Sequence, residues 1–203
     1  MCMEKSIIVS KVLNCLNEVS EDTGSSVNGV LDFIMENFLE EAGIQLLRCA
    51  PLYAIGKYHD FSGAEIHASD NGSGYVTLPD NFVRLVAFRM SGWHRDATHL
   101  YDIFDPVYQK QSNPYLRGGA AKPIVIRDNK RLLYFSVTEG REHIIERAEA
   151  VVRIPVGSTY PEVLIEPLAW LTASKILDVL CEGQQANMAR EQFAQSINLL
   201  KIN

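Results

Sequence analysis

The sequence predicts an α+β protein, with N- and C-terminal helices packed as a bundle and a central antiparallel β-rich insert. Apolar residues recur at three- and four-residue spacings near both ends of the chain, which is typical of amphipathic helices. In the middle of the chain, short apolar stretches alternate with turn residues, which is typical of strands. We therefore divide the chain into N-terminal helices at 1–50, a β-rich insert at 51–157 and C-terminal helices at 158–203.

Two helices are predicted in the first fifty residues. The apolar residues between Ile7 and Val19 form one stripe, and the polar run 21–26 interrupts it. Ser25 or Ser26 in that run is suited to cap a second helix. Gly43 is one candidate end for this helix, and continuation to Pro51 is the other.

Turn motifs locate the strands of the insert. Asp70-Asn71-Gly72-Ser73-Gly74 predicts a tight turn before a strand at 75–78. Asp128-Asn129-Lys130 predicts a hairpin between strands at 124–126 and 132–135.

Two further segments of the insert are predicted from their apolar patterns. Residues 82–90 are expected to form a longer strand with Val83, Leu85, Ala87 and, by continuation, Arg89 on one face. The segment 143–154 suits a strand, although its centre also tolerates a helix.

Helical spacing returns in the last third. Tyr160-Pro161-Glu162 is a suitable helix opening, and Pro167 predicts either a kink or a delayed start. Gly183 separates a final helix, for which we predict an apolar face made of Ala186, Met188, Phe193, Ile197 and Leu200. We expect 4–47 and 161–200 to pack together, with no strand in either terminal third.

Composition and charge exclude several classes of protein. The chain has 203 residues with 19 Lys and Arg against 25 Asp and Glu, and this acidic balance argues against a general nucleic-acid binder. No apolar run approaches the roughly 20 residues of a membrane span, and the first residues lack the features of a signal peptide. We therefore expect an intracellular protein without a membrane partner. The four cysteines are scattered without a CxxC pair, so we expect reduced and mostly buried thiols.

Positive charge is concentrated in one segment of the insert. Residues 117–153 carry 8 basic and 5 acidic groups, whereas residues 1–50 carry 3 and 8. Such a segment suits contact with phosphates or with an acidic partner surface. A solvated β face is the simpler explanation. The basic residues are Arg117, Lys122, Arg127, Lys130, Arg131, Arg141, Arg147 and Arg153.

Motifs for catalysis are weak. The five histidines do not form an HExxH pair, no GxSxG elbow occurs, and Gly118 to Lys122 lacks the spacing of a phosphate loop. We therefore predict no enzyme activity, catalytic residue, metal site or cofactor. One alternative is a small metal-dependent hydrolase using His94, His99 and Asp96, and another is a cellular scaffold module.

Several short motifs resemble a known family when they are taken in order. The stretch Leu78-Pro79-Asp80-Asn81-Phe82-Val83-Arg84-Leu85 resembles a segment of the head-to-tail connector, or neck ring, proteins of tailed bacteriophages. The sequence continuing to Trp93, and the stretch 121–125, are similar to versions in crAss-like and other phages of Bacteroidetes. The small-residue-rich stretch 165–177 also matches the family, and the resemblance spans roughly residues 27–200.

This resemblance implies a structural virion protein and no catalytic residue. The expected assembly is a homo-oligomeric ring, commonly of twelve copies, that joins the portal protein to other neck or tail proteins. DNA passes through its lumen without sequence-specific binding. The expected location is the neck or tail of the virion, after synthesis in the bacterial host cytoplasm. A closed ring of this kind has heterologous interfaces, in which two different surfaces meet.

Seven residues are candidates for these interfaces. Arg84 is expected on the same strand face as Phe82, where it can pair with an acidic group. Trp93 and Tyr115 lie in loop-like stretches, and exposed aromatic side chains are common interface anchors, although core packing is an equal alternative for Trp93. The candidate set is Arg84, Trp93, Tyr115, Arg117, Arg127, Lys130 and Arg131.

Overall fold

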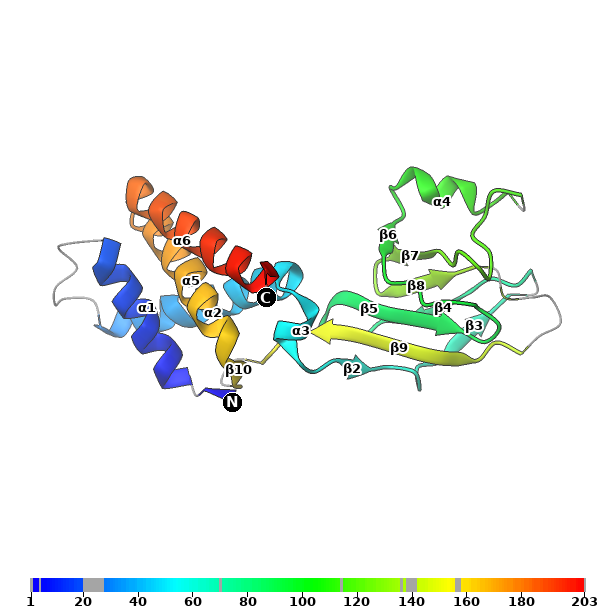
Figure 1. Cartoon of the computed structure of the whole chain (residues 1–203), viewed down its shortest axis with the longest axis horizontal. Helices are drawn as coiled ribbons and strands as arrows, with labels where there is room; N and C mark the ends of the chain where they lie inside the picture. Colours follow the sequence, from blue (N-terminus) through cyan, green and yellow to red (C-terminus); the bar gives the residue numbers. More distant parts are fainter. Residues whose placement is uncertain are drawn as a thin grey trace. The chain divides into compact units, whose positions relative to one another are not determined.

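The protein consists of a helical unit and a β unit (Figure 1). The computed structural model describes residues 2–3, 5–19, 28–69, 71–113, 115–135, 137, 142–155 and 158–202. Residues 1–56 and 153–203 form the helical unit, and residues 57–152 form the β unit. Helices near both ends with strands between them confirm the predicted α+β class. The β unit is narrower than the predicted insert, because 51–56 and 153–157 belong to the helical unit.

The helical unit is built around one central helix. The helix α5 contacts all three of the other long helices, and eleven of its fifteen side chains are buried. Small side chains such as Ala169 and Ala173 are fully buried, which lets neighbouring helices approach closely. The long helices are α1 (Lys5–Val19), α2 (Asn28–Cys49), α5 (Ile165–Val179) and α6 (Gly183–Ile202).

The helix ends follow local chemistry. A single 3-10 turn, η1 (Glu162–Leu164), precedes α5, so Pro167 falls in the first turn of the helix, where its missing N–H costs little. This is the delayed start that was one of the two alternatives. The helix α2 continues through Gly43 to Cys49. The proposed caps Ser25 and Ser26 lie outside the described residues.

Three features of the helical unit differ from expectation. A two-residue antiparallel ladder joins β1 (Cys2–Met3) to β10 (Tyr160–Pro161), although no strand was expected in either terminal third. A short helix, α3 (Leu52–Ile55), follows α2. On α6, Met188 is 47% exposed and Ala189 is buried in its place.

The β unit contains two sheets. The first has strand order β2-β9-β5 and is antiparallel, and the second has strand order β3-β4-β8-β7-β6. The strands are β2 (His59–Asp60), β3 (Ile66–Ala68), β4 (Gly74–Thr77), β5 (Phe82–Met90), β6 (Leu100–Asp102), β7 (Val125–Asp128), β8 (Arg131–Tyr134) and β9 (Ile145–Val152).

One strand pair corrects the expectation of an antiparallel insert. The strands β6 and β7 are parallel, whereas every other pair of the two sheets is antiparallel. Parallel neighbours need a long connection, and here residues 103–124 supply it. That connection contains the short helix α4 (Pro106–Lys110), whose first turn is capped by Asp105 through a 2.8 Å hydrogen bond from the Val107 amide.

The hydrophobic core of the β unit includes side chains from both sheets. Phe88 of β5 and Tyr134 of β8 are completely buried, and their ring centroids lie 6.3 Å apart. Trp93 meets Phe88 edge-on at 5.9 Å. The core therefore depends on large aromatic residues, whose burial contributes most per residue.

The inward face of β5 differs from the prediction. The strand has the predicted bounds, but its pairing with β9 shifts register between Leu85 and Ala87 and at two other points. Such bulges interrupt the regular alternation of side chains between the two faces of a strand. As a result, Leu85, Phe88 and Met90 belong to the core cluster, whereas Val83 and Ala87 are buried outside it.

The remaining predictions about strands are confirmed. Strands β3 and β4 pair across the predicted tight turn, and β7 and β8 pair across the predicted hairpin, in which Asn129 has a φ of 55°. Residues 145–152 form a strand rather than a helix. The expectation of buried thiols holds for Cys15, but Cys49 and Cys181 are exposed.

Candidate functional site

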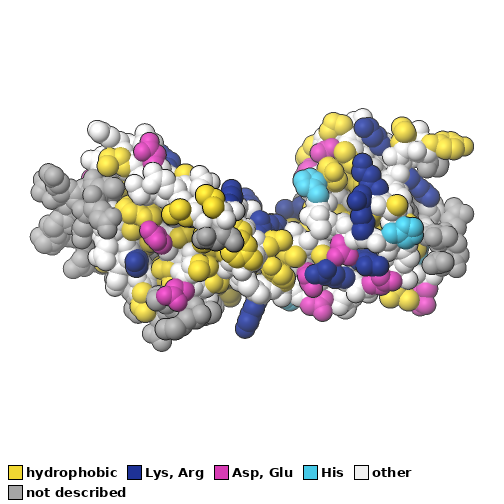
Figure 2. Space-filling view, viewed as in Figure 1, with side chains coloured by type: hydrophobic (Ala, Val, Ile, Leu, Met, Phe, Trp, Pro, Cys, Tyr) yellow, Lys and Arg dark blue, Asp and Glu magenta, His cyan; other side chains and the backbone are white. Residues whose placement is uncertain are grey.

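The hairpin between β7 and β8 brings three of the predicted interface residues together. Arg127 lies near the end of β7, Lys130 lies in the turn, and Arg131 begins β8. All three side chains are exposed. Figure 2 shows Lys and Arg side chains gathered over one face of the β unit.

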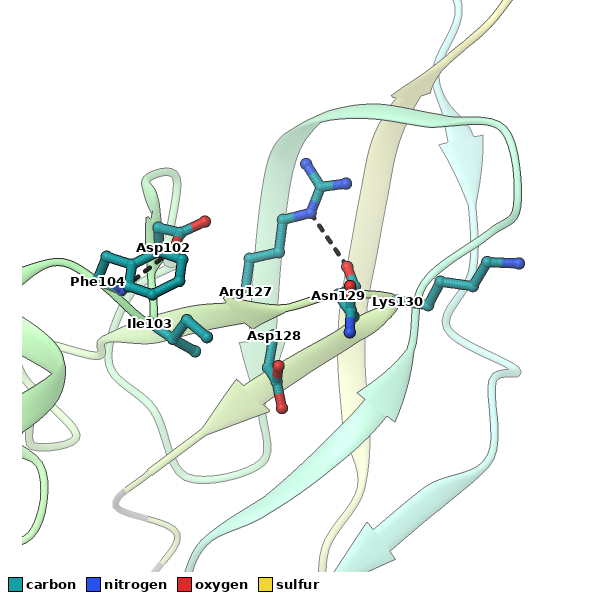
Figure 3. Close-up of a pocket in the computed structure, with 7 residues that line it drawn as sticks. All are labelled: Asp102, Ile103, Phe104, Arg127, Asp128, Asn129 and Lys130. Carbon is teal, nitrogen blue, oxygen red and sulfur yellow. Dashed lines mark hydrogen bonds between the residues drawn. The ribbon is translucent and has the colours of Figure 1, made fainter.

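A hollow of about 490 Å³ adjoins this hairpin. Because β6 and β7 are parallel, their carboxyl ends lie at the same edge of the sheet, and Asp102 is in register with Arg127. Figure 3 shows Arg127 and Asp128 extending to opposite sides of β7, while Lys130 points away from Phe104. The lining residues are Asp102, Ile103, Phe104, Arg127, Asp128, Asn129 and Lys130.

Neighbouring groups hold the two arginines of the hairpin. The Arg127 Nε donates to the Asn129 carbonyl oxygen at 3.2 Å, and its guanidinium lies 5.5 Å from the Phe82 ring centroid. The Arg131 guanidinium lies 4.6 Å from the Tyr75 ring centroid. Both distances suit cation–π attraction, which restrains the side chains without neutralising their charge.

The lysine of the hairpin has an acidic partner. The Lys130 ammonium lies 2.5 Å from Oδ1 of Asp80, which is the acidic residue of the Leu78–Leu85 segment. This hydrogen bond and charge lower the pKa of the Asp80 carboxyl. Arg131 is paired with Asp128 in the β7–β8 register, so Arg127 and Arg131 lie on opposite faces of the sheet, with Lys130 in the turn between them.

The other predicted interface residues lie elsewhere in the β unit. Tyr115 is 95% exposed in the connection between β6 and β7. Arg117 is half-buried and donates to the Asn71 carbonyl oxygen at 3.2 Å. Arg84 is half-buried on β5, opposite Val151, and does not line the hollow.

The structure contradicts an interface role for Trp93. Its side chain is 2% exposed, and it belongs to the core cluster beside Phe88. The positive φ of Gly92, 83°, accompanies a turn that directs the chain back into the core. Trp93 is therefore a packing residue.

The residues considered for a hydrolase do not form a metal site. Asp96 accepts a 2.7 Å hydrogen bond from Arg147 and lies 3.8 Å from Arg89, while His94 and His99 are exposed. In the part of the chain that the structure describes, no three His, Cys, Asp or Glu side chains gather as metal ligands would. Asp96, which follows β5, instead pairs with Arg89 of β5 and Arg147 of β9.

Sequence reasoning missed two contributors to the hairpin site. Phe104 is 89% exposed at the rim of the hollow, and Asp102 lies beside Arg127. The sequence around Asp102 indicates only an aspartate in a turn. In the structure this aspartate accepts a 3.1 Å hydrogen bond from the Phe104 amide. Its place beside Arg127 depends on the parallel pairing of β6 and β7.

Charge is divided unevenly between the two units. The helical unit carries 7 Lys and Arg against 13 Asp and Glu, whereas the β unit carries 12 of each. The whole net charge of −6 therefore belongs to the helical unit. The helical unit is thus acidic, whereas the exposed β7–β8 hairpin carries Arg127, Lys130 and Arg131.

Comparison with protein-family models and with curated proteins gives no match to this chain. Among the described residues, none of the helices combines the length and apolar character that crossing a membrane requires.

Proposed function

We propose that this chain is a structural virion protein: a head-to-tail connector whose copies form a ring between the portal and the tail of a bacteriophage. The ring is part of the conduit for DNA. In this role the chain carries out no chemistry, and its partners are other copies of itself, the portal protein and further neck or tail proteins.

The observation that carries the proposal is the placement of the Leu78–Leu85 segment within the order of elements. The long helices α1 and α2 and the short α3 precede it, it leads into β5, and the small-residue-rich α5 and the amphipathic α6 follow the sheets. Its acidic residue, Asp80, also contacts the cationic hairpin through Lys130. One of the motifs that carry the resemblance therefore contacts the hairpin that we assign to assembly.

The division of charge supports a ring of heterologous contacts. Each copy has an acidic helical unit and a β unit with an exposed cationic hairpin. Head-to-tail copies bring two different surfaces together, and opposite charges favour that arrangement over the meeting of two identical surfaces. Exposed pairs are individually weak, so several of them must act together at each junction.

Native mass spectrometry tests the proposal directly. The chain is measured alone and after co-expression with the portal protein encoded in the same genome. We expect either a ring with a mass near twelve times 22.8 kDa, or a monomer that joins the portal as a ring. A chain that remains monomeric and does not bind the portal would exclude the connector role and favour the scaffold alternative.

A further inference from the structure

A second hollow of the β unit is lined by cationic side chains. It has a volume of about 350 Å³ and lies where the parallel strands β6 and β7 begin. Two segments form it, residues 95–99 before β6 and residues 122–124 before β7, together with Tyr101. It is thus distinct from the hollow at the carboxyl ends of the same strands.

The cations of this hollow differ from most others of the β unit. Arg95 and Lys122 are exposed, and neither side chain pairs with a carboxylate, a carbonyl oxygen or an aromatic ring of the described residues. Most described cations of the unit do have such a partner. These are Arg89, Arg117, Arg127, Lys130, Arg131 and Arg147.

The one carboxylate in the hollow is already occupied. Asp96 is bound by Arg147 at 2.7 Å and lies 3.8 Å from Arg89, and its ion pairs among the described residues are with these two arginines rather than with Arg95 or Lys122. Thr98, His99 and Tyr101 add hydroxyl and imidazole groups that can donate hydrogen bonds. The His99 and Tyr101 rings meet edge-on at 4.3 Å, which restrains both.

We propose that this hollow binds a phosphate group, with Arg95 and Lys122 as its charged donors. Arginine offers a planar fork and lysine a compact charge, and both suit phosphate oxygens. The turn at Gly119 does not act as a phosphate loop. Its amide and that of Lys122 are used in hydrogen bonds to each other's carbonyl oxygens, so recognition falls to side chains. This proposal does not rest on the connector role.

The experiment measures ³¹P line broadening of inorganic phosphate by the full chain, with chloride adjusted to hold ionic strength constant. Two charged donors in an open hollow suggest a Kd on the order of 1 mM. The double variant Arg95→Gln/Lys122→Gln should weaken binding about tenfold or more. The control Lys57→Gln/Lys110→Gln, which makes the same charge change in residues that line neither hollow, should bind as the parent does.

A second arm identifies the source of the phosphate. Anisotropy of a labelled twelve-base-pair DNA duplex is measured with the same variants. If the chain binds the duplex and Arg95→Gln/Lys122→Gln abolishes that binding, the phosphate belongs to a nucleic-acid backbone. If the chain binds phosphate but not the duplex, the ligand is a small phosphate compound. The proposal is overturned if the site and control variants lose phosphate binding equally, or if the site variant binds as the parent does. Lys122→Gln alone provides the same comparison should the double variant fail to fold.

Discussion

Lys130 and Asp80, fifty residues apart in the chain, connect the two sheets of the β unit through a 2.5 Å ion pair. Lys130 belongs to the β7–β8 turn of the five-stranded sheet, and Asp80 precedes β5 of the three-stranded sheet. Beside this pair, the Leu78 amide donates to the Lys130 carbonyl oxygen at 2.8 Å. The acidic residue of the motif therefore has a structural partner within its own chain.

The pair predicts a specific titration. Lys130 lowers the pKa of Asp80 from its ordinary value of 3.8, so the pair stabilises the fold above that value, and this contribution is lost as pH falls through the lowered pKa. Lys130→Gln should return the Asp80 pKa toward 3.8 in a carboxyl-carbon NMR titration. Asp60 is the internal control, because the Ser62 amide, at 2.8 Å, is the main cause of its lowered pKa. An unchanged Asp80 titration would contradict the contact.

Two phenylalanines of β5 should differ in their contribution to stability. Phe88 is completely buried, so Phe88→Ala should lower the free energy of unfolding of the β unit by about 3–5 kcal/mol. Phe82 is half-buried at the margin of the core, so Phe82→Ala should cost less, about 1–2 kcal/mol. Urea unfolding is followed by Trp93 fluorescence in a Trp170→Phe background, because each unit contains one of the two tryptophans. A larger loss for Phe82→Ala than for Phe88→Ala would contradict the placement of Phe88 in the core and of Phe82 at its margin.

Gly43 is required by packing in the helical unit. A methyl group added at Gly43 would overlap the phenol oxygen of Tyr160, which is buried against α2. Gly43→Ala should therefore destabilise the helical unit by about 1–3 kcal/mol, despite the better helix propensity of alanine. In a double-mutant cycle, Tyr160→Phe should recover part of this loss, because it removes the overlapping oxygen. Additive effects of the two changes would show that they do not meet.

Asp96 separates two like charges. Arg89 and Arg147 are direct cross-strand partners on β5 and β9, and Asp96 contacts both. Asp96→Asn removes a carboxylate from between the two guanidinium groups, so their mutual repulsion should increase. We expect the unfolding free energy to fall by about 1 kcal/mol at low salt, and by less at high salt. Glu65→Gln, which changes an exposed carboxylate of the same unit, is the control. Equal effects of the two variants would mean that Asp96 has no special role.

Assembly should depend on salt through the hairpin. Arg127→Gln/Lys130→Gln/Arg131→Gln should slow assembly at low salt and flatten its response to added salt, because screening blunts exposed pairs beyond about 8 Å. Light scattering across a salt series measures both effects. The matched control is Lys11→Gln/Lys57→Gln/Lys110→Gln, which removes the same charge from other exposed positions. A hairpin variant that assembles as the parent does would identify the hairpin as a solvated face.

Strand β5 shows what the sequence pattern can and cannot determine. Its bounds were predicted from the apolar pattern of residues 82–90, which is a local signal. Its inward face was predicted incorrectly, because bulges arise from pairing with β9, which is more than fifty residues away. Local chemistry thus determines where a strand lies, and its partner determines which side chains it buries.

The candidate site divides in the same way. The charge pattern and turn motif identified Arg127, Lys130 and Arg131, which share one hairpin. Asp102 and Phe104 join them only through the parallel pairing of β6 and β7, which no short-range signal indicates. Trp93 was ambiguous because a tryptophan after a strand suits either a core or an interface, and only burial separates the two.

The division of the helical unit into two stretches of chain has a consequence for synthesis. The helix α2 ends at Cys49, whereas its packing partner α5 begins only at Ile165. On the ribosome, every residue of the β unit is made before the helix that covers α1 and α2 exists. The β unit is thus able to fold first, whereas the apolar faces of α1 and α2 stay uncovered until α5 has been translated.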